Sequence, residues 1–322
     1  EMLRSMEFST RSLIKKMKVE VICTTDDPSD DLEHHLKLKG SFEIPVLPTF
    51  RPDNVIKTDD PLKFIQYIGK LGQSAGKSID SFETLVEVLD HRHEFFHQMG
   101  GRLSDHGPDR FYYSPFDFEE VHKIFKKLLK GRVLDTEETE KYRTAIMLEL
   151  CRMNHKRGWT QQFHVGAMRN NNSRMFRTMG PDTGWDSIGI AQDALKMSAF
   201  LNELDDTDQL SQTILYNLNP ADNEMMIAMA GNFNDGSRPV KVQYGAAWWF
   251  LDQKTGMEKH LKDLSALGIL SRFVGMVTDS RSFLSYPRHE YFRRIACNFI
   301  GEEVEKGTIP DDDGLLKSLI EG

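Results

Sequence analysis

Short apolar runs alternate with amphipathic segments along the whole chain. The short runs predict strands, and apolar positions that recur three to four residues apart predict helices. Strands are expected at residues 19–23, 43–47, 101–104, 160–166, 213–218, 240–244 and 273–277. Helices are expected at 10–18, 30–39, 62–71, 82–99, 118–129, 136–157, 191–204, 223–230, 254–267 and 288–306.

Strand-then-helix units in series indicate a parallel sheet with right-handed crossovers. Seven predicted strands are one fewer than the eight of a closed (β/α)₈ barrel. We therefore predict a single TIM-type α/β barrel domain over residues 1–322 that lacks its N-terminal part, including the first strand, with a helical insertion at 116–157. The alternative is an open doubly wound sheet, but the sequence has no Gly-rich phosphate turn of the kind such sheets carry.

The composition restricts the class of protein. With 39% hydrophobic and 28% charged residues, the chain is typical of a globular protein, and no apolar run approaches the ~20 residues of a membrane span. The net charge of -8 and the lack of a basic stripe argue against a nucleic-acid partner. Cys23, Cys151 and Cys297 are far apart, which fits neither a disulfide framework nor a zinc site and indicates a cytoplasmic setting.

The carboxyl ends of barrel strands are where active sites form. Asp279 follows the run 273–277, and Arg281 lies two residues further on. Arg51 follows the second run, in Thr-Phe-Arg-Pro-Asp. Because a guanidinium binds carboxylates in bidentate fashion, Arg51 is a candidate for anion binding; a salt bridge to Asp53 is the structural alternative.

Two further strand ends carry histidine. Asp105 and His106 follow the third run as a catalytic pair or as a turn cap. His164 lies within the fourth run, and alternation places it on the opposite face from Phe163. It is either a site residue or a core histidine.

Polar and aromatic residues occur at other strand ends. Arg169 and Asn170–Asn172 are suited to a polyhydroxyl ligand, or to making turns. Trp248, next to Trp249, offers a stacking floor for a sugar ring, or packs in the core. Arginines, aspartates, a histidine and a tryptophan together favour a sugar acid as the ligand.

Two other polar pairs are interpreted as structural. His34 and His35 lie on a predicted helix away from any strand end, and we expect both at the surface. Asp26 and Asp27 precede Pro28, where capping of the next helix is favoured over metal binding.

Five segments, 24–28, 46–53, 163–172, 247–250 and 273–286, closely resemble the uronate isomerases (glucuronate isomerases) of the amidohydrolase superfamily. The resemblance implies a barrel of the metal-dependent hydrolase type. It also implies the aldose-ketose isomerisation of D-glucuronate to D-fructuronate, and of D-galacturonate to D-tagaturonate, in bacterial hexuronate catabolism. This reaction moves a proton from C2 to C1 through a cis-enediol.

The predicted site then has catalytic and substrate-binding members. They are Asp279, His164 and Asp105 as catalytic residues, and Arg51, Arg281, Trp248 and Arg169 as substrate-binding residues. The resemblance makes Asp279 a ligand of a divalent metal, expected to be zinc. The His-x-His metal pair of the family's first strand is absent, because His91 and His93 fall within a predicted helix.

The expected partner is a small uronic acid, with no nucleic acid and no membrane; a homo-oligomer is left open. Two alternatives stay open beside the isomerase: a metal-dependent hydrolase of a sugar acid or lactone, and a non-catalytic sugar-acid-binding protein. The isomerase prediction requires the strand-end residues to meet around one opening of a single barrel.

Overall fold

The computed structural model describes residues 2–277, 279–280 and 282–321. The chain divides into two compact units within β4 (Thr160–Val165) and β7 (Thr213–Asn217). Unit 1 comprises Glu1–Glu20, His164–Ala191 and Ile214–Gly322, and unit 2 comprises Val21–Phe163 and Gln192–Thr213.

Unit 2 is built on parallel strands. β1 (Ile22–Asp26), β2 (Val46–Phe50), β3 (Leu103–His106) and β4 are hydrogen-bonded in that order. The register places Ile22 of β1 beside Val46 of β2, and Leu103 of β3 beside Thr160 of β4. β1 to β4 are parallel and therefore present their carboxyl ends at one edge of the sheet.

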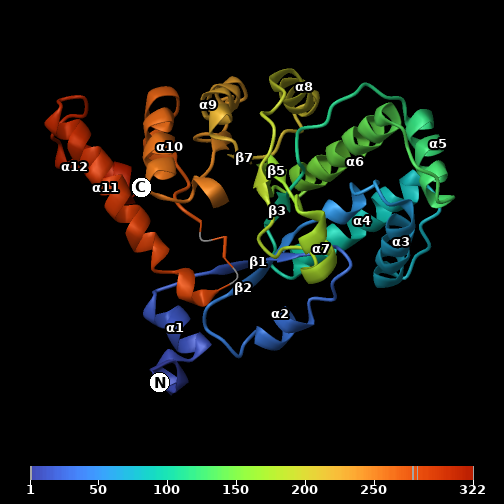
Figure 1. The fold of residues 1–322 in the computed structure, drawn as a ribbon, viewed down its shortest axis with the longest axis horizontal. Helices are drawn as coiled ribbons and strands as arrows, with labels where there is room; N and C mark the ends of the chain where they lie inside the picture. Colours follow the sequence, from blue (N-terminus) through green and yellow to red (C-terminus); the bar gives the residue numbers. More distant parts are fainter. Residues whose placement is uncertain (1, 278, 281, 322) are drawn as a thin grey trace. The chain divides into compact units, whose positions relative to one another are not determined.

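The helices of unit 2 form a packed group. They are α2 (Glu33–Leu38), α3 (Pro61–Ala75), α4 (Phe82–Gln98), α5 (Phe118–Leu129), α6 (Thr136–Lys156) and α8 (Ala194–Asp205), with the 3₁₀ helix η3 at Asp53–Val55. α3, α4, α5 and α6 pack against one another (Figure 1). Capping boxes at Asp117 and Asp135 start α5 and α6, because each carboxylate accepts a backbone N–H that the helix itself leaves unpaired. Both helices begin where the sequence predicts.

Unit 1 combines strands, helices and short 3₁₀ turns. The strands are β5 (Ala167–Met168), β6 (Ser187–Ile188), β7 and β8 (Val242–Tyr244). The α-helices are α1 (Thr10–Lys16), α7 (Ser173–Met179), α9 (Asn223–Asn232), α10 (Lys254–Leu267), α11 (Arg288–Glu305) and α12 (Asp313–Glu321). The 3₁₀ helices are η1 (Met2–Arg4), η2 (Met6–Phe8), η4 (Pro220–Asp222), η5 (Trp249–Leu251), η6 (Leu270–Arg272) and η7 (Phe283–Ser285). α9, α10 and α11 pack in succession (Figure 1).

Two apolar clusters form the core of unit 1. One gathers side chains of β7 and of the segment after β8, namely Ile214, Tyr216, Leu218, Ala246 and Trp248. The other joins α10 to α11 through Met257, Leu261, Met276 and Ile295. The partly buried Phe273 packs against both clusters, so the segment after α10 belongs to the core.

Six of the seven predicted strands are present, and the one at 273–277 is not. These residues form no strand, because Gly275 has φ +81°, a left-handed conformation that interrupts an extended backbone. The Val274 amide donates to the Gln243 side chain (3.1 Å) in place of a strand ladder. The prediction of a buried strand before Asp279 is therefore wrong. The segment is apolar because its side chains pack against the core of unit 1.

The first two strands lie three residues later than predicted, at 22–26 and 46–50. Polar Thr24, Thr25 and Asp26 are included because the ladder continues to Asp26, which pairs with Phe50. Backbone pairing here outweighs the apolar pattern on which the prediction relied. The short elements α7, β5 and β6 were not predicted, since two-residue strands leave no periodic signal.

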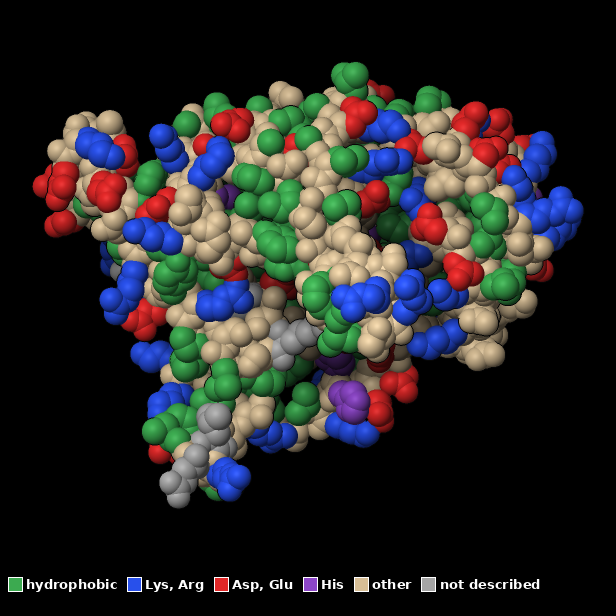
Figure 2. All heavy atoms as spheres, viewed as in Figure 1, with side chains coloured by type: hydrophobic (Ala, Val, Ile, Leu, Met, Phe, Trp, Pro, Cys, Tyr) green, Lys and Arg blue, Asp and Glu red, His purple; other side chains and the backbone are tan. Residues whose placement is uncertain are grey.

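Charged side chains of both signs are interspersed on the face seen in Figure 2. No helix in the described ranges is at once long and apolar enough to span a bilayer.

The buried His260 predicts an acid-sensitive stability. Burial lowers the pKa of His260 to about 4, from an ordinary value of 6.5. As the pH falls from about 6.5 to about 4, the unfolded chain takes up a proton that the folded chain does not, so the free energy of unfolding drops by up to about 3 kcal/mol. His260→Gln, which retains a donor toward the Gly245 carbonyl, should weaken this dependence in urea denaturation measured at several pH values.

Residual pH dependence is expected in that variant, because burial also lowers the pKa of His93, to about 3. The exposed His34, whose side chain is 82% accessible, supplies the control: His34→Gln should leave the pH profile unchanged. An unaltered profile in His260→Gln would contradict the prediction.

Candidate active site

In unit 2, Arg51 lies between two carboxylates. It follows β2, and its backbone N–H donates to the Asp26 carbonyl (2.9 Å). Its side chain donates from Nε to Asp53 Oδ2 (2.8 Å) and from Nη1 to Asp105 Oδ2 (2.9 Å). The predicted alternative, a salt bridge to Asp53, is therefore present, and a second ion pair links the ends of β2 and β3.

Asp105 and His106 point to opposite faces of β3, because adjacent strand residues alternate. Asp105 contacts Arg51. His106 is buried, its ring stacks on Phe163 (centroids 5.1 Å apart), and its Nε2 lies 3.1 Å from Ser104 Oγ. The two residues therefore do not form a catalytic pair, and Asp105 alone lies on the Arg51 side.

Gly107 lies next to the Arg51 guanidinium and also contacts Asp53. Its backbone N–H donates to both carboxylate oxygens of Asp53 (3.1 and 3.2 Å). A Cβ at this position would lie 2.2 Å from Arg51 Nη2, far closer than a van der Waals contact. The guanidinium therefore occupies space that only glycine leaves open.

The Thr24–Pro28 stretch serves mainly to build the fold. The Asp27 carboxylate accepts hydrogen bonds from Ser29 N and Oγ, Asn54 Nδ2 and Tyr67 OH. These contacts are structural, but the predicted capping of the next helix is wrong, because the N-cap of α2 is Leu32. Next to it, burial raises the pKa of the Asp26 carboxyl, and Thr24 Oγ1 donates to Asp26 Oδ2 (2.6 Å).

The prediction that His34 and His35 are both at the surface is wrong for His35. Its side chain is only 9% accessible, and its Nε2 lies 2.7 Å from Thr24 Oγ1. Neighbouring helix positions point about 100° apart, so one histidine faces the sheet while the other faces solvent.

In unit 1, Trp248 is joined to Asp279. The indole is 5% accessible and belongs to the apolar cluster of β7, and its Nε1 donates to Asp279 Oδ2 (2.6 Å). Trp248 thus packs in the core, as the alternative to sugar stacking predicts, and also orients a carboxylate. The Asp279 residue itself is exposed to solvent.

His164 lies flat against Tyr216. The ring centroids are 4.3 Å apart with an interplanar angle of 3°, and Trp248 meets the imidazole edge-on at 4.9 Å. Asp279, Trp248, His164 and Tyr216 are therefore connected by direct contacts within unit 1. Sequence reasoning missed Tyr216, although its polar hydroxyl in the apolar run 213–218 was a signal.

Backbone strain accompanies this group. Asp279 has φ +37° and Trp249 has φ +50°, a left-handed conformation that costs non-glycine residues about 1–3 kcal/mol. Such strain persists where the surrounding contacts enforce it. Arg281, the predicted carboxylate contact, lies outside the described residues.

Arg169 lies beside Trp249, with its guanidinium carbon 5.1 Å from the ring centroid. Its Nη1 is 3.7 Å from Asp182 and 3.9 Å from Asp186. The asparagines that follow make turns: Asn170 has φ +56°, and Asn172 caps α7. Of the two interpretations offered for these asparagines, ligand binding or turns, their local geometry matches the turns.

The residues in hand do not supply a complete metal site. Among the parts of the chain that the structure describes, no three His, Cys, Asp or Glu side chains are grouped so as to hold an ion. Asp279 is the ligand predicted from the sequence, and its Oδ2 is already bonded to an indole N–H. A single carboxylate of this kind does not make a metal site.

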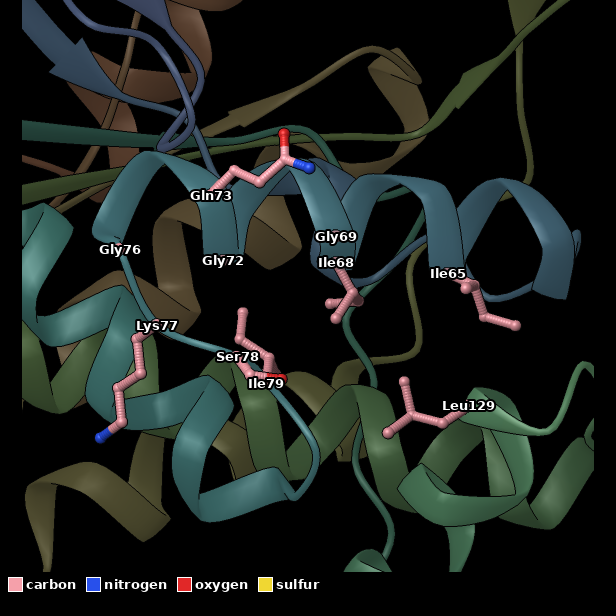
Figure 3. A pocket seen from close by; sticks show the side chains of 10 residues that line it. All are labelled: Ile65, Ile68, Gly69, Gly72, Gln73, Gly76, Lys77, Ser78, Ile79 and Leu129. Atoms are coloured by element: carbon pink, nitrogen blue, oxygen red, sulfur yellow. The ribbon is translucent and has the colours of Figure 1, made fainter.

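A cavity of about 460 Å³ lies elsewhere in unit 2 (Figure 3). It is lined by residues of α3, of the turn that follows it and of the end of α5: Ile65, Ile68, Gly69, Gly72, Gln73, Gly76, Lys77, Ser78, Ile79 and Leu129. None of these is a predicted site residue. The walls combine aliphatic side chains and glycines with a few polar groups and lie away from the strand ends.

A parallel α/β fold with arginine, carboxylate and histidine side chains at the strand ends is the arrangement found in TIM-barrel proteins. A family model described as glucuronate isomerase matches residues 1–322, and the chain belongs to this family. The resemblance found in the sequence is thereby confirmed.

Curated relatives carry the name uronate isomerase. The one from Cellvibrio japonicus (strain Ueda107) is 49% identical over 100% of this chain and 69% of its own length. That from Bacteroides fragilis (strain YCH46) is 52% identical over 96% of this chain and 66% of its own length. The chain thus spans about two thirds of the length of these relatives.

Solved structures give the same result for the fold. A uronate isomerase from Thermotoga maritima matches with a TM-score of 0.87 and 36% identity, covering 93% of this chain and 65% of that chain. A glucuronate isomerase from Caulobacter crescentus matches with a TM-score of 0.88 and 25% identity, covering 99% and 64%. The predicted fold class, a TIM-type α/β barrel, is confirmed.

The space around Arg51 predicts opposite outcomes for two Gly→Ala changes. Gly107→Ala should displace the guanidinium from its two carboxylates and lower the free energy of unfolding by about 1–2 kcal/mol. Gly69→Ala, on α3 with nothing within 4 Å, should raise it by up to about 1 kcal/mol, because alanine is the better helix former. Urea denaturation of both variants tests this, and equal shifts would argue against a packed Arg51.

The Trp248–Asp279 contact predicts a distinctive NMR signal. A short hydrogen bond to a carboxylate should move the Trp248 indole N–H downfield and slow its exchange. Asp279→Ala should reverse both effects and leave the signal of the half-exposed Trp185 in place. A Trp248 signal that does not respond would show that the bond is absent in solution.

Proposed function

We propose that the full-length protein containing this chain is an aldose-ketose isomerase acting on uronic acids. It interconverts D-glucuronate with D-fructuronate, and D-galacturonate with D-tagaturonate. The observation that carries the proposal is the match of the glucuronate isomerase family model over residues 1–322. The small uronic acid is the expected partner, and the cytoplasm the expected compartment.

The reaction has three chemical requirements. A base must take the C2 proton, an electrophile must stabilise the developing charge on the C1 oxygen, and a cation must hold the C6 carboxylate. We assign proton movement to Asp279, with His164 and Asp105 as further catalytic residues. The contacts of Asp279 with Trp248, and of Trp248 with His164, support this assignment for unit 1.

Arg51 is assigned to substrate hydroxyls, with Arg281 as the carboxylate contact. A bidentate grip uses two neighbouring donors of the guanidinium. In Arg51, Nε already donates to Asp53 and Nη1 to Asp105, so each pair of neighbouring donors has at least one member engaged with the protein. Single hydrogen bonds to hydroxyl groups suit the donors of such an arginine better than a second carboxylate does. Trp248 and Arg169 complete the substrate-binding set.

A divalent metal, expected to be zinc, is proposed for the full-length protein with Asp279 as the ligand from this chain. Such an ion would polarise a substrate oxygen as a Lewis acid. The residue roles assigned above do not depend on it. We also propose that residues 1–322 form a single barrel domain with a helical insertion at 116–157.

The proposal predicts ketose formation. The full-length protein incubated with D-glucuronate or D-galacturonate should yield D-fructuronate or D-tagaturonate, which chromatography with authentic standards detects. Asp279→Asn should lower kcat by about 100-fold or more, since general acid-base groups contribute about 10²–10⁴-fold.

The two alternatives give different results in the same assay. A hydrolase of a sugar acid or lactone would release acid from a uronolactone and form no ketose. A non-catalytic binder would retain affinity for uronates with no turnover of either kind. If the full-length protein, supplied with a divalent metal, forms no ketose, the proposal is overturned.

A further inference from the structure

We propose that Asp53 is a positioning residue that sets the orientation of the Arg51 guanidinium. This proposal rests on the proposed function, because it concerns an arginine assigned to the substrate. Neither the family match nor the sequence analysis gives Asp53 a part in the reaction. Its role follows from hydrogen bonds at the ends of β2 and β3.

The first support is that Asp53 joins two loops at once. Its carboxylate accepts from Arg51 Nε (2.8 Å) in the loop after β2 and from Gly107 N (3.1 and 3.2 Å) in the loop after β3. Gly107 follows His106 directly, so the second bond fixes the backbone two residues after Asp105. One carboxylate thereby sets the spacing between the two strand ends.

The second support is the geometry of the guanidinium. A planar group held at one point can still rotate, whereas hydrogen bonds from two of its nitrogens to separate acceptors define its plane. Asp53 holds Nε, and Asp105 holds Nη1 at 2.9 Å. Gly107 leaves room for Nη2, because a Cβ there would lie 2.2 Å from that nitrogen. Arg51 is thus fixed from three sides before any substrate binds.

The third support is burial. The Asp53 side chain is 12% accessible and that of Asp105 is 8%. Ion pairs at such positions are screened much less than exposed ones, so removing one acceptor should change the position of Arg51 and not merely its solvation. A misplacement of about 1 Å in a positioning group can reduce a rate about 100-fold.

A double-mutant cycle tests the proposal in the full-length protein. The four proteins are wild type, Asp53→Asn, Arg51→Lys and the double variant, and the readout is kcat/KM for D-glucuronate. Asp53→Asn alone should lower kcat/KM about 10- to 100-fold. In the Arg51→Lys background, where the Nε donor is gone, the same change should lower it less than about threefold, because the two residues act as one unit.

A second measurement covers variants with too little turnover. The same cycle is measured by calorimetry with L-gulonate, the C1-reduced form of D-glucuronate, which keeps the carboxylate and hydroxyl groups but has no C1 aldehyde and so cannot isomerise. Non-additive losses of affinity support the proposal. If the loss in the double variant equals the product of the two single-variant losses, in turnover or in binding, the proposal is overturned. Such a result is expected for a purely structural residue, which acts independently of Arg51.

The matched control is Asp59→Asn. Asp59 also pairs with an arginine, Arg143 Nη2 at 3.0 Å, but its side chain is 82% accessible, so kcat/KM should change less than about twofold. An equal effect of Asp59→Asn and Asp53→Asn would also overturn the proposal. A wild-type protein that forms no ketose and binds no L-gulonate would instead refute the proposed function, so the two failures are distinguishable.

Discussion

The arrangement at the ends of β2 and β3 depends on one guanidinium held between two carboxylates. Arg51 reaches Asp53 through Nε and Asp105 through Nη1. Parallel pairing places β2 and β3 side by side, so residues 54 positions apart in sequence meet. An arginine fixed in this way loses little conformational freedom when it binds a ligand, so it is preorganised for binding.

The same interaction restricts what Arg51 can bind. Since Nε and Nη1 already donate to protein carboxylates, the role proposed for Arg51 is to bind hydroxyl groups and not a second carboxylate. Unit 1 shows a related arrangement in which a neutral donor, the Trp248 indole, holds one oxygen of Asp279. In both units the side chains assigned to chemistry are oriented by neighbours: Asp53, which the sequence offered only as a salt-bridge alternative, and Trp248, which the sequence assigned to the substrate.

Much of this was predictable from the sequence, and the failures have physical causes. Arg51, Asp105 and His164 were singled out as candidates because polar residues at the ends of apolar runs are conspicuous. Asp53 was recognised only as an alternative partner, since its bond to Gly107 depends on the neighbouring strand. His35 was missed because a six-residue helix is too short to show which side faces the sheet. The run at 273–277 misled because apolar residues pack equally well in a strand or in an irregular segment.

The central claim concerns where the donors of Arg51 go when a sugar acid is bound. A crystal structure of the full-length protein with L-gulonate measures this directly. The account predicts that Arg51 Nε and Nη1 stay on Asp53 and Asp105 while the guanidinium meets the ligand through a hydroxyl group. A structure in which Arg51 has left both carboxylates and grips the ligand carboxylate with two parallel hydrogen bonds would contradict it.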